Sequence, residues 1–179
     1  MPRRTGTLYQ GDNLTILRTR LPAASVDLAY LDPPFNSRRS FHVLGREEEE
    51  PVFTDTIPWD DDAEEAFAEV ERLPAARRAA VLLRSLRAFL GEGPLLAYLA
   101  LMALRVVEIR RVLAPTGSLY LHCDPTASHY LKLVLDAVFG QDAFRNEIIW
   151  QRFSAKNDPR RFGRGHDVLL LYARGQKST

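Results

Sequence analysis

The chain has 179 residues and a mass of 20.3 kDa, with 46% hydrophobic and 26% charged residues. These proportions and this length suit one soluble globular domain with its own core. The single cysteine, Cys123, excludes a disulfide-built scaffold, and the histidines and this cysteine show no zinc-ligand spacing. The longest apolar run, residues 95–104, is about half of the roughly 20 residues that a spanning helix needs. The N-terminus lacks the apolar segment of a signal peptide. We therefore expect a cytoplasmic protein without a membrane segment or a metal site.

The net charge of +1 conceals a strong asymmetry along the chain. Residues 46–71 hold twelve acids and one base, whereas residues 145–179 hold eight bases and three acids. The overall charge therefore says little about partners, and the basic C-terminal stretch is the part that favours an anionic one.

The first predicted elements are a short helix and a strand. Residues 13–20 predict one or two helical turns, with Asp12 or Asn13 as the N-cap. Residues 25–31 (SVDLAYL) form an apolar run that stops at Asp32-Pro33-Pro34. Because two consecutive prolines end the ladder of backbone hydrogen bonds, this pattern predicts a strand that runs into a rigid turn.

The middle of the chain predicts a loop followed by helices. Residues 36–62 are acidic and contain several prolines, which indicates a long acidic loop. Residues 62–72 and 74–90 show apolar residues at helical spacing, and residues 95–113 form a strong helix after Pro94.

The last third predicts strands and one more helix. Residues 118–123 and 146–152 predict strands, and the amphipathic residues 127–138 between them predict a helix. A basic loop, 153–166, then leads to a final apolar strand, 167–173. Strands that alternate with helices indicate an α/β fold, here with a mostly parallel sheet and an antiparallel hairpin at its C-terminal end.

The turn after the first strand carries the clearest chemical signal. Open parallel sheets bind ligands at the carboxyl ends of their strands. The carboxylate of Asp32 and the carbonyl of Pro33 are two acceptors that can hold the hydrogens of an amino group, and the prolines keep them rigid. Phe35 offers a flat surface on which a base swung out of a duplex can stack. Asp-Pro-Pro is also a common turn sequence and Phe35 is also compatible with a core position, so a structural role stays open.

The basic loop is the candidate nucleic-acid contact. Its cations suit phosphate contacts, and Phe153 and Phe162 interleave with them as expected where bases or sugars also touch. The cations are Arg152, Lys156, Arg160, Arg161 and Arg164. A solvated surface loop is the alternative.

Three blocks of the sequence resemble a known family. They are residues 11–37, 111–140 and 144–173, and they contain GDN, LDPPFN, SLYLHCDPTASHYLK and NEIIW. Together they resemble the N-terminal catalytic half of the permuted, β-group DNA amino-methyltransferases of restriction-modification systems. The resemblance implies a Rossmann-like methyltransferase sheet, S-adenosylmethionine as the methyl donor, double-stranded DNA as the substrate and no metal.

The resemblance also assigns roles to residues. The catalytic motif matches Asp32, Pro33, Pro34 and Phe35, and phenylalanine at its end favours adenine over cytosine. The cofactor residues it implies are Asp12, Leu31 and Asp32. The candidate contacts to substrate DNA are Asn36 and the basic-loop residues Lys156, Arg160, Arg161 and Arg164. For His122, a packing role and a substrate contact stay equally open, and Cys123 is expected to be a small buried residue.

One expected part of such an enzyme is missing from the sequence. The glycine-rich cofactor loop of this group lies C-terminal to the blocks found here, and Phe162-Gly163-Arg164-Gly165 lacks the strand and helix that would flank it. We therefore expect residues 1–179 to form the catalytic half of a domain whose cofactor-loop half is absent. An incomplete sheet leaves an exposed edge, so a complementing C-terminal half, a homodimer partner or a restriction subunit are the expected partners.

The sequence thus predicts a site-specific DNA adenine N6 methyltransferase. A substitution of Asp32 tests this prediction most directly. Two alternatives stay open. One is a non-catalytic nucleic-acid-binding remnant without cofactor affinity. The other is a methyltransferase that acts on cytosine N4 or on another amino or amide acceptor, because Asp-Pro-Pro-aromatic turns serve those acceptors too.

Overall fold

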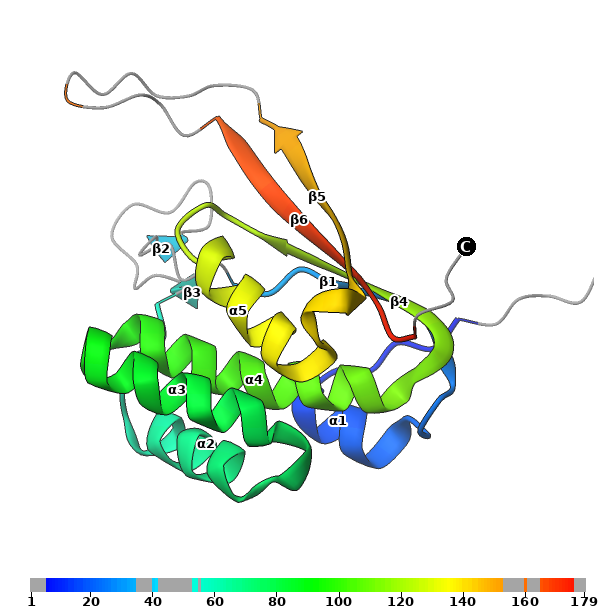
Figure 1. The fold of residues 1–179 in the computed structure, drawn as a ribbon, viewed down its shortest axis with the longest axis horizontal. Helices are drawn as coiled ribbons and strands as arrows, with labels where there is room; N and C mark the ends of the chain where they lie inside the picture. The colour runs from blue at the N-terminus through cyan, green and yellow to red at the C-terminus, as the bar shows by residue number, and fades with distance from the viewer. Residues whose placement is uncertain are drawn as a thin grey trace, which may run out of the picture.

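A computed structural model gives the fold of the chain (Figure 1). It describes residues 6–34, 40–41, 53–54, 56–152, 160 and 165–175. The helices are α1 (Asn13–Arg20), α2 (Asp61–Arg72), α3 (Arg77–Leu90), α4 (Pro94–Val112) and α5 (Ser128–Phe139), with short 3₁₀ turns η1 (Pro74–Ala76) and η2 (Gln141–Ala143). The strands are β1 (Val26–Leu31), β2 (Ser40–Phe41), β3 (Phe53–Thr54), β4 (Leu113–Cys123), β5 (Phe144–Gln151) and β6 (His166–Ala173).

Most predicted elements are confirmed, with three differences. The helix predicted over 74–90 begins with the 3₁₀ turn η1, and the α-helix starts only at Arg77. Strand β4 starts at Leu113, five residues before the predicted start, since α4 ends at Val112 and the backbone at once becomes extended. Within the stretch predicted as an irregular loop, β2 and β3 pair as a short antiparallel ladder.

The main sheet has the strand order β1-β4-β6-β5. Strand β1 runs parallel to β4, and Leu31 pairs with Leu121. Strand β6 runs antiparallel to both β4 and β5 and lies between them. The predicted α/β class and the C-terminal hairpin are confirmed. The described sheet is mixed rather than mostly parallel, because the second strand of the hairpin, and not the first, pairs with β4.

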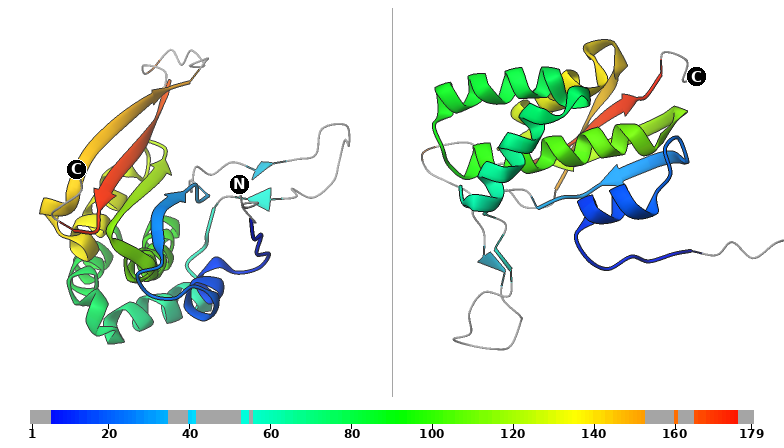
Figure 2. Two further views of the ribbon diagram at one scale, coloured as in Figure 1. Left: turned by 90° about the vertical axis from the view of Figure 1, so that its right-hand side faces the viewer. Right: turned by 90° about the horizontal axis from the view of Figure 1, so that it is seen from below.

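The helices lie together on one side of the sheet (Figure 2). Burial alternates along β4: Leu119, Leu121 and Cys123 are fully buried, whereas Tyr120 and His122 are only half-buried. The buried set faces α4 and α5, and we call this side the helix-covered face. In the described part of the chain no helix covers the opposite face.

Helix α4 explains why the helical layer is stable. It packs against α1, α2, α3 and α5 as well as β4, and it is buried along nearly its whole length. A helix in this position must be apolar all round rather than on one stripe. The sequence supplies that pattern from Leu95 to Leu104, and Arg105 is the first charged residue that follows.

None of the helices that the structure describes is long and apolar enough to span a membrane. The described residues also contain no group of three or more histidine, cysteine or acidic side chains placed to hold a metal ion.

Candidate functional site

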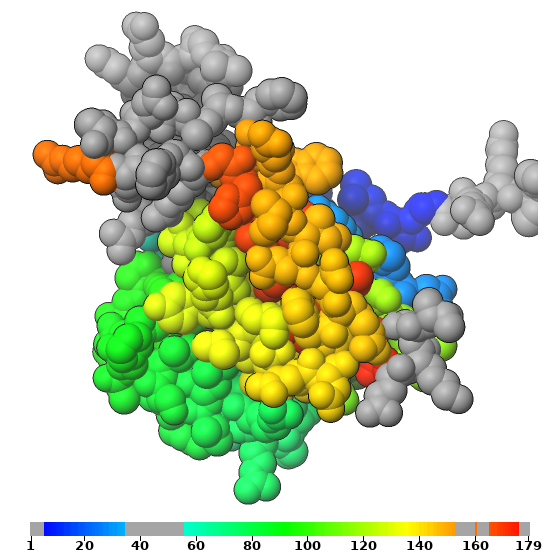
Figure 3. Space-filling view, turned by 45° about the horizontal axis from the view of Figure 1, so that its top comes forward, coloured from blue at the N-terminus to red at the C-terminus, as the bar shows by residue number. Residues whose placement is uncertain are grey.

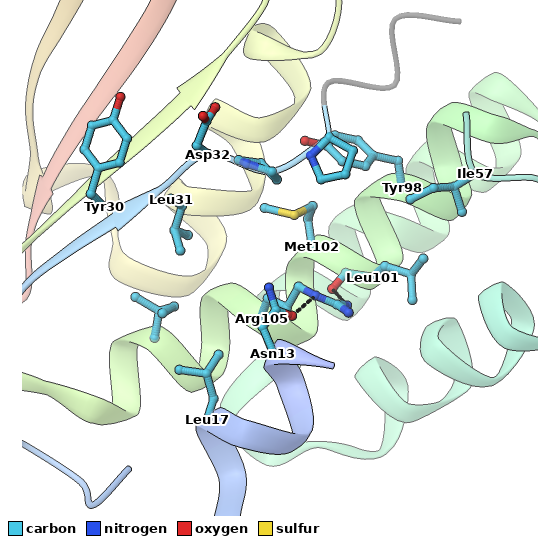
Figure 4. Close-up of a pocket in the computed structure, with 13 residues that line it drawn as sticks. Asn13, Leu17, Tyr30, Leu31, Asp32, Ile57, Tyr98, Leu101, Met102 and Arg105 are labelled. Carbon is cyan, nitrogen blue, oxygen red and sulfur yellow. Dashed lines mark hydrogen bonds between the residues drawn. The ribbon is translucent and has the colours of Figure 1, made fainter. Parts of the chain in front are cut away.

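The Asp32-Pro33-Pro34 turn follows β1 directly and lies at the carboxyl end of the β1–β4 parallel pair. Beside it is a cavity of about 380 Å³, enclosed by this turn, α1 and α4 (Figure 4). The apolar lining side chains are Leu17, Leu31, Ile57, Leu101, Met102 and Ile109. Ligands of open α/β sheets bind at this edge, as the sequence predicted.

The polar end of the cavity is held by Arg105 on α4. Its Nε donates to Asn13 Oδ1 at 2.7 Å, and its NH2 group lies 2.9 Å from Asp12 Oδ2. Figure 4 shows Arg105 and Asn13 meeting at the lower end of the cavity, away from Asp32. Arg105 therefore ties the start of α1 to α4 and gives the cavity a charged wall.

Asp12 is the N-cap of α1. Its Oδ1 accepts hydrogen bonds from the backbone N–H of Thr15 at 2.8 Å and from the Thr15 hydroxyl at 2.9 Å. The backbone hydrogen bond of Thr15 is the largest of the effects that lower the pKa of Asp12 from its ordinary value, and Arg105 contributes in the same direction. The predicted N-cap is confirmed, and the role of Asp12 toward a cofactor stays a prediction.

Asp32 is reachable from solvent and has a basic neighbour. Its side chain is 62% exposed, and its Oδ1 lies 3.1 Å from Nδ1 of His122 on β4. The other ring nitrogen of His122, Nε2, lies 3.3 Å from Oδ2 of Asp167 on β6. The sequence left open whether His122 has a packing role or belongs to the site. In the structure, His122 contacts Asp32, the residue that the sequence places at the centre of the chemistry.

Cys123 faces away from this site. Its Sγ points to the carbonyl of Val168 at 3.6 Å, on the helix-covered face. Burial is the main cause that raises the pKa of this thiol to about 12. The thiol therefore stays protonated, as expected of a small buried residue and not of a nucleophile.

The structure brings together part of the predicted site. Leu31, Asp32, Pro33 and Pro34 line one cavity, and Asp12 lies behind its polar end. Of the predicted DNA contacts, the structure describes Arg152 and the exposed Arg160. The predicted residues that lie outside the described part of the chain are Phe35, Asn36, Lys156, Arg161 and Arg164.

The residues of α4 that line the cavity, Met102 and Arg105 among them, were not predicted as site residues. Met102 lines the apolar wall of the cavity and Arg105 its polar end. The available signal was the single arginine that interrupts the apolar run of the strongest helix, because a charge inside such a helix must find a partner or a cavity.

Strand β5 forms the outer edge of the sheet. Ile149 and Trp150 are 56% and 61% exposed, and β5 lies on the surface beside α5 in Figure 3. The edge that β1 forms on the other side carries Leu28 and Tyr30, which are 57% and 54% exposed. Among the described residues, both end strands of the sheet therefore carry exposed apolar side chains.

Comparisons with known proteins agree with one another on the kind of protein this is. The model of the family N6_N4_Mtase, described as DNA methylase, matches residues 26–179. The Type III restriction-modification enzyme StyLTI Mod subunit of Salmonella typhimurium is 27% identical over 167 residues, which are 92% of this chain and 23% of that protein. The Type II methyltransferase M.EcaI of Enterobacter cloacae is 25% identical over 171 residues, which are 95% of this chain and 29% of that protein.

A further relative is the Type III restriction-modification enzyme EcoP15I Mod subunit of Escherichia coli, 22% identical over 95% of this chain and 24% of that protein. The chain thus spans about a quarter of the length of these relatives. Among solved structures, the PvuII DNA methyltransferase (cytosine-N4-specific) matches with a TM-score of 0.47 and 13% identity, over 96% of this chain and 50% of that one.

Proposed function

Because the chain belongs to the DNA methylase family, we propose that it takes part in the transfer of a methyl group from S-adenosylmethionine to an amino group of a base in double-stranded DNA, with adenine N6 as the acceptor. The observation that carries this proposal is the position of the Asp32-Pro33-Pro34 turn. It follows a parallel strand, and it forms one wall of a ligand-sized cavity while its aspartate stays accessible.

The turn suits the amino group of a base. The lone pair of that nitrogen is delocalised into the ring, which makes the amine a poor nucleophile. Two fixed acceptors, the Asp32 carboxylate and the Pro33 carbonyl, draw its two hydrogens out of the ring plane and free the lone pair. Since the prolines hold both acceptors in place, little reorganisation is needed as the charge develops. Phe35 is proposed to stack on the base.

The cavity suits a small methyl donor. Its volume of about 380 Å³ lies within the range of small-molecule sites, and its wall combines apolar side chains with a few polar groups. S-adenosylmethionine supplies a methyl group on a positively charged sulfur. We assign Leu31 and Asp32 to the wall that would hold it, and Asp12 to its polar end, where an ionised carboxylate keeps acceptor sites beyond those used by Thr15 and Arg105.

The reaction is balanced without any further reagent. The amine nitrogen forms a bond to the methyl carbon as the carbon–sulfur bond breaks, with the bonding electron pair left on sulfur. The nitrogen then releases one proton. Asp32, whose carboxylate already accepts from the amine, is the group next to that proton.

Contacts to DNA and to other proteins extend this proposal. Arg152 precedes the stretch predicted as the basic loop and Arg160 lies within it, and phosphate contact is their proposed role with Lys156, Arg161 and Arg164. Asn36 is proposed to lie beside the target base. A restriction subunit is a proposed partner, since two relatives are named as Mod subunits of restriction-modification enzymes. A complementing C-terminal half or a second copy is proposed to cover the β1 edge.

The experiment compares Asp32→Ala with the wild type in the protein as its gene encodes it. Methyl transfer from isotopically labelled S-adenosylmethionine to plasmid DNA is measured, and the nucleosides are then separated by mass. We expect methyladenine with the wild type and a loss of at least about 10²-fold with Asp32→Ala, the usual result of removing an organised polar group from a transition state.

Asp27→Ala is the matched control, because Asp27 is another exposed aspartate on β1 and faces no part of the cavity. Full activity of Asp32→Ala would overturn the proposal. Methylcytosine as the product would move the acceptor to cytosine N4. Binding of DNA without any calorimetric binding of S-adenosylmethionine would favour the non-catalytic remnant.

A further inference from the structure

A line of four charged or ionisable side chains crosses the opposite face of the sheet. The register of the sheet explains this line. Leu31 of β1 pairs with Leu121 of β4, so the residues that follow them, Asp32 and His122, are neighbours. On β6, Leu169 pairs with His122, and Asp167 lies two residues before Leu169. On β5, Trp150 pairs with Asp167, and Arg152 lies two residues after Trp150. The four side chains thus form a diagonal that touches every strand of the main sheet.

The four side chains are linked by ion-pair distances, although the contacts at His122 Nε2 and Asp167 Oδ1 lack hydrogen-bond geometry. Asp32 Oδ1 and His122 Nδ1 are 3.1 Å apart, and His122 Nε2 and Asp167 Oδ2 are 3.3 Å apart. Arg152 NH2 lies 3.2 Å from Asp167 Oδ1. The side chain of Asp167 is only 5% exposed, that of His122 is 20% exposed and that of Asp32 is 62% exposed. The line therefore leads from a buried aspartate to the solvent-exposed aspartate of the Asp32-Pro33-Pro34 turn.

The main feature of this arrangement is the number of protons that the ring of His122 can carry between two carboxylates. An ionised carboxylate only accepts hydrogen bonds, and a neutral imidazole carries a single N–H. Each ring nitrogen of His122 lies close to a carboxylate oxygen. With a neutral ring, one of these nitrogens presents a lone pair to a carboxylate, and it is ready to take up a proton that arrives there. The doubly protonated ring donates toward both acids.

The neighbours of His122 carry charges of both signs. Arg152 offsets the charge of the buried Asp167, so a proton on the ring of His122 balances the charge of Asp32. The next aspartate along the chain, Asp124, does not take part, because its carboxylate accepts hydrogen bonds from the backbone N–H groups of Thr126 and Ala127, just before α5.

We propose that His122 is a positioning residue that receives, through Asp32, the proton released by the methylated amine, while Asp167 holds the imidazole in place. The inference rests on the proposed function for the origin of that proton. The amine nitrogen loses one proton to the Asp32 carboxylate, and Asp32 returns to its ionised form by passing the proton to Nδ1 of His122. The protonated ring then lies between two carboxylates and gives the proton to water after the product leaves.

The first test needs no methylation activity. The ring nitrogens of the histidines are labelled with ¹⁵N in the 179-residue chain, and His122→Gln identifies the signals of His122 by their loss. The ratio of charged to neutral ring is measured at the pH where the wild-type ratio is one. We expect Asp32→Asn to lower this ratio about fivefold, the effect of one unit charge near 3 to 4 Å even in bulk water.

Asp167→Asn is expected to lower the ratio at least as much, because Arg152 then faces the ring without the intervening negative charge. Asp27→Asn is the control, since it lies five residues from Asp32, about 16 Å along an extended chain. An unchanged ratio in both Asp32→Asn and Asp167→Asn would overturn the proposal.

The second test measures methyl transfer in the protein as its gene encodes it. His122→Gln keeps a polar side chain beside Asp32 but cannot take up the proton. We expect kcat to fall on the order of tenfold to a hundredfold, no more than the usual contribution of an acid–base group, with an unchanged KM for DNA. The loss should shrink as the pH rises, because water and hydroxide then remove the proton. Tyr120→Phe, on the same strand and face, should leave kcat unchanged.

The two proposals fail in different ways. Methyl transfer by Asp32→Ala would overturn the proposed function. An inactive Asp32→Ala together with a His122→Gln that keeps wild-type kcat from about pH 6 to pH 9 would overturn only the role of His122. If thermal melting shows that His122→Gln is unfolded, Asp167→Asn takes its place, with the same expected loss of kcat.

Discussion

Strand β6 carries a polar cluster on each face, and the two clusters differ in what they leave accessible. On the helix-covered face, the Tyr172 hydroxyl donates to Asp136 Oδ1 at 2.7 Å. Lys132 Nζ contacts the two Asp136 oxygens at 2.9 and 2.8 Å and lies 4.2 Å from the centre of the Phe144 ring. We call Lys132, Asp136 and Tyr172 the inner cluster. Each of its charges has a protein partner, and aromatic rings cover it.

On the opposite face, Asp167 and Arg152 begin a similar set of ion pairs. It passes through His122 and ends at Asp32, and we call these four residues the outer cluster. Both clusters contain an aspartate within hydrogen-bond distance of a cationic group, and Asp136 and Asp167 are both buried. The difference is the end point, because the outer cluster ends at the solvent-exposed Asp32 and the inner cluster ends at groups that are largely buried.

Strand β6 therefore contributes to two clusters with different roles. A closed, satisfied cluster specifies how α5 docks on the sheet, and its burial holds the pKa of Tyr172 above the ordinary range, so that the hydroxyl stays a donor. The outer cluster keeps a histidine beside the exposed aspartate of the turn.

The largest expected difference separates the two faces themselves. Leu170 is 1% exposed on the helix-covered face, and Leu171 is only partly buried on the opposite face. Leu170→Ala should lower the free energy of unfolding by about 2–5 kcal/mol, because it leaves a cavity among packed helices. Leu171→Ala should cost about 1 kcal/mol, since less apolar surface is removed from contact. Urea unfolding of both variants measures the difference.

The two leucines are neighbours of the same type, so strand propensity cancels between them. Equal losses would mean that the opposite face is packed as tightly as the helix-covered one, and the comparison of the faces would fail.

A smaller effect is expected inside the inner cluster. Tyr172→Phe keeps the ring contacts with Phe139 and Phe144, whose centres lie 5.8 and 5.4 Å away, and removes only the hydroxyl. The free energy of unfolding should fall by about 1.5–3 kcal/mol, the contribution of a hydrogen bond to a charged group. Thermal and urea unfolding give the value. Tyr120→Phe on the opposite face should stay within about 0.5 kcal/mol of the wild type.

If the two Tyr→Phe variants lose equal stability, the Tyr172 hydroxyl contributes no more than a tyrosine hydroxyl outside both clusters. In that case the distinction between a stabilising and a functional cluster would not hold.

Local signals predicted much of this molecule. Two prolines after an apolar run mark the end of β1, and the periodicity of apolar residues locates α2, α4 and α5 to within one or two residues. These features depend on neighbours in the sequence, so a pattern of a few residues is sufficient.

Contacts between distant segments were not predictable in the same way. Asp32 and His122 are brought together by the pairing of β1 with β4, and Asp167 joins them because β6 inserts between β4 and β5. Periodicity gives no strand order or register, so His122 had two equal readings until the sheet was known. The mixed sheet was not predicted for the same reason, because tertiary packing decides which strand of the hairpin pairs with β4.

The smallest effect is expected at a third polar contact, the exposed pair of Asp12 and Arg105 at the cavity. The side chain of Asp12 is 51% exposed, so water screens its charge far more than that of either cluster on β6. Asp12→Ala removes the N-cap of α1 and should cost about 1 kcal/mol. Asp12→Asn keeps a capping oxygen and should cost only a few tenths of a kcal/mol, which isolates the part that is due to charge.

The sign of the pH dependence follows from the lowered pKa of Asp12. Because the hydrogen bond from Thr15 favours the ionised form in the folded state, the contribution of this charge is complete above the ordinary pKa of 3.8 and is lost as the pH falls through the lowered value. Urea unfolding at neutral and acidic pH should therefore show the wild type and Asp12→Asn converging in acid. Two results would show that this contact is buried in solution. One is a difference in unfolding free energy between the wild type and Asp12→Asn that widens in acid, and the other is a loss of stability in Asp12→Ala as large as that in Leu170→Ala. Exposure would then no longer separate the polar contacts of the site from those that hold the fold.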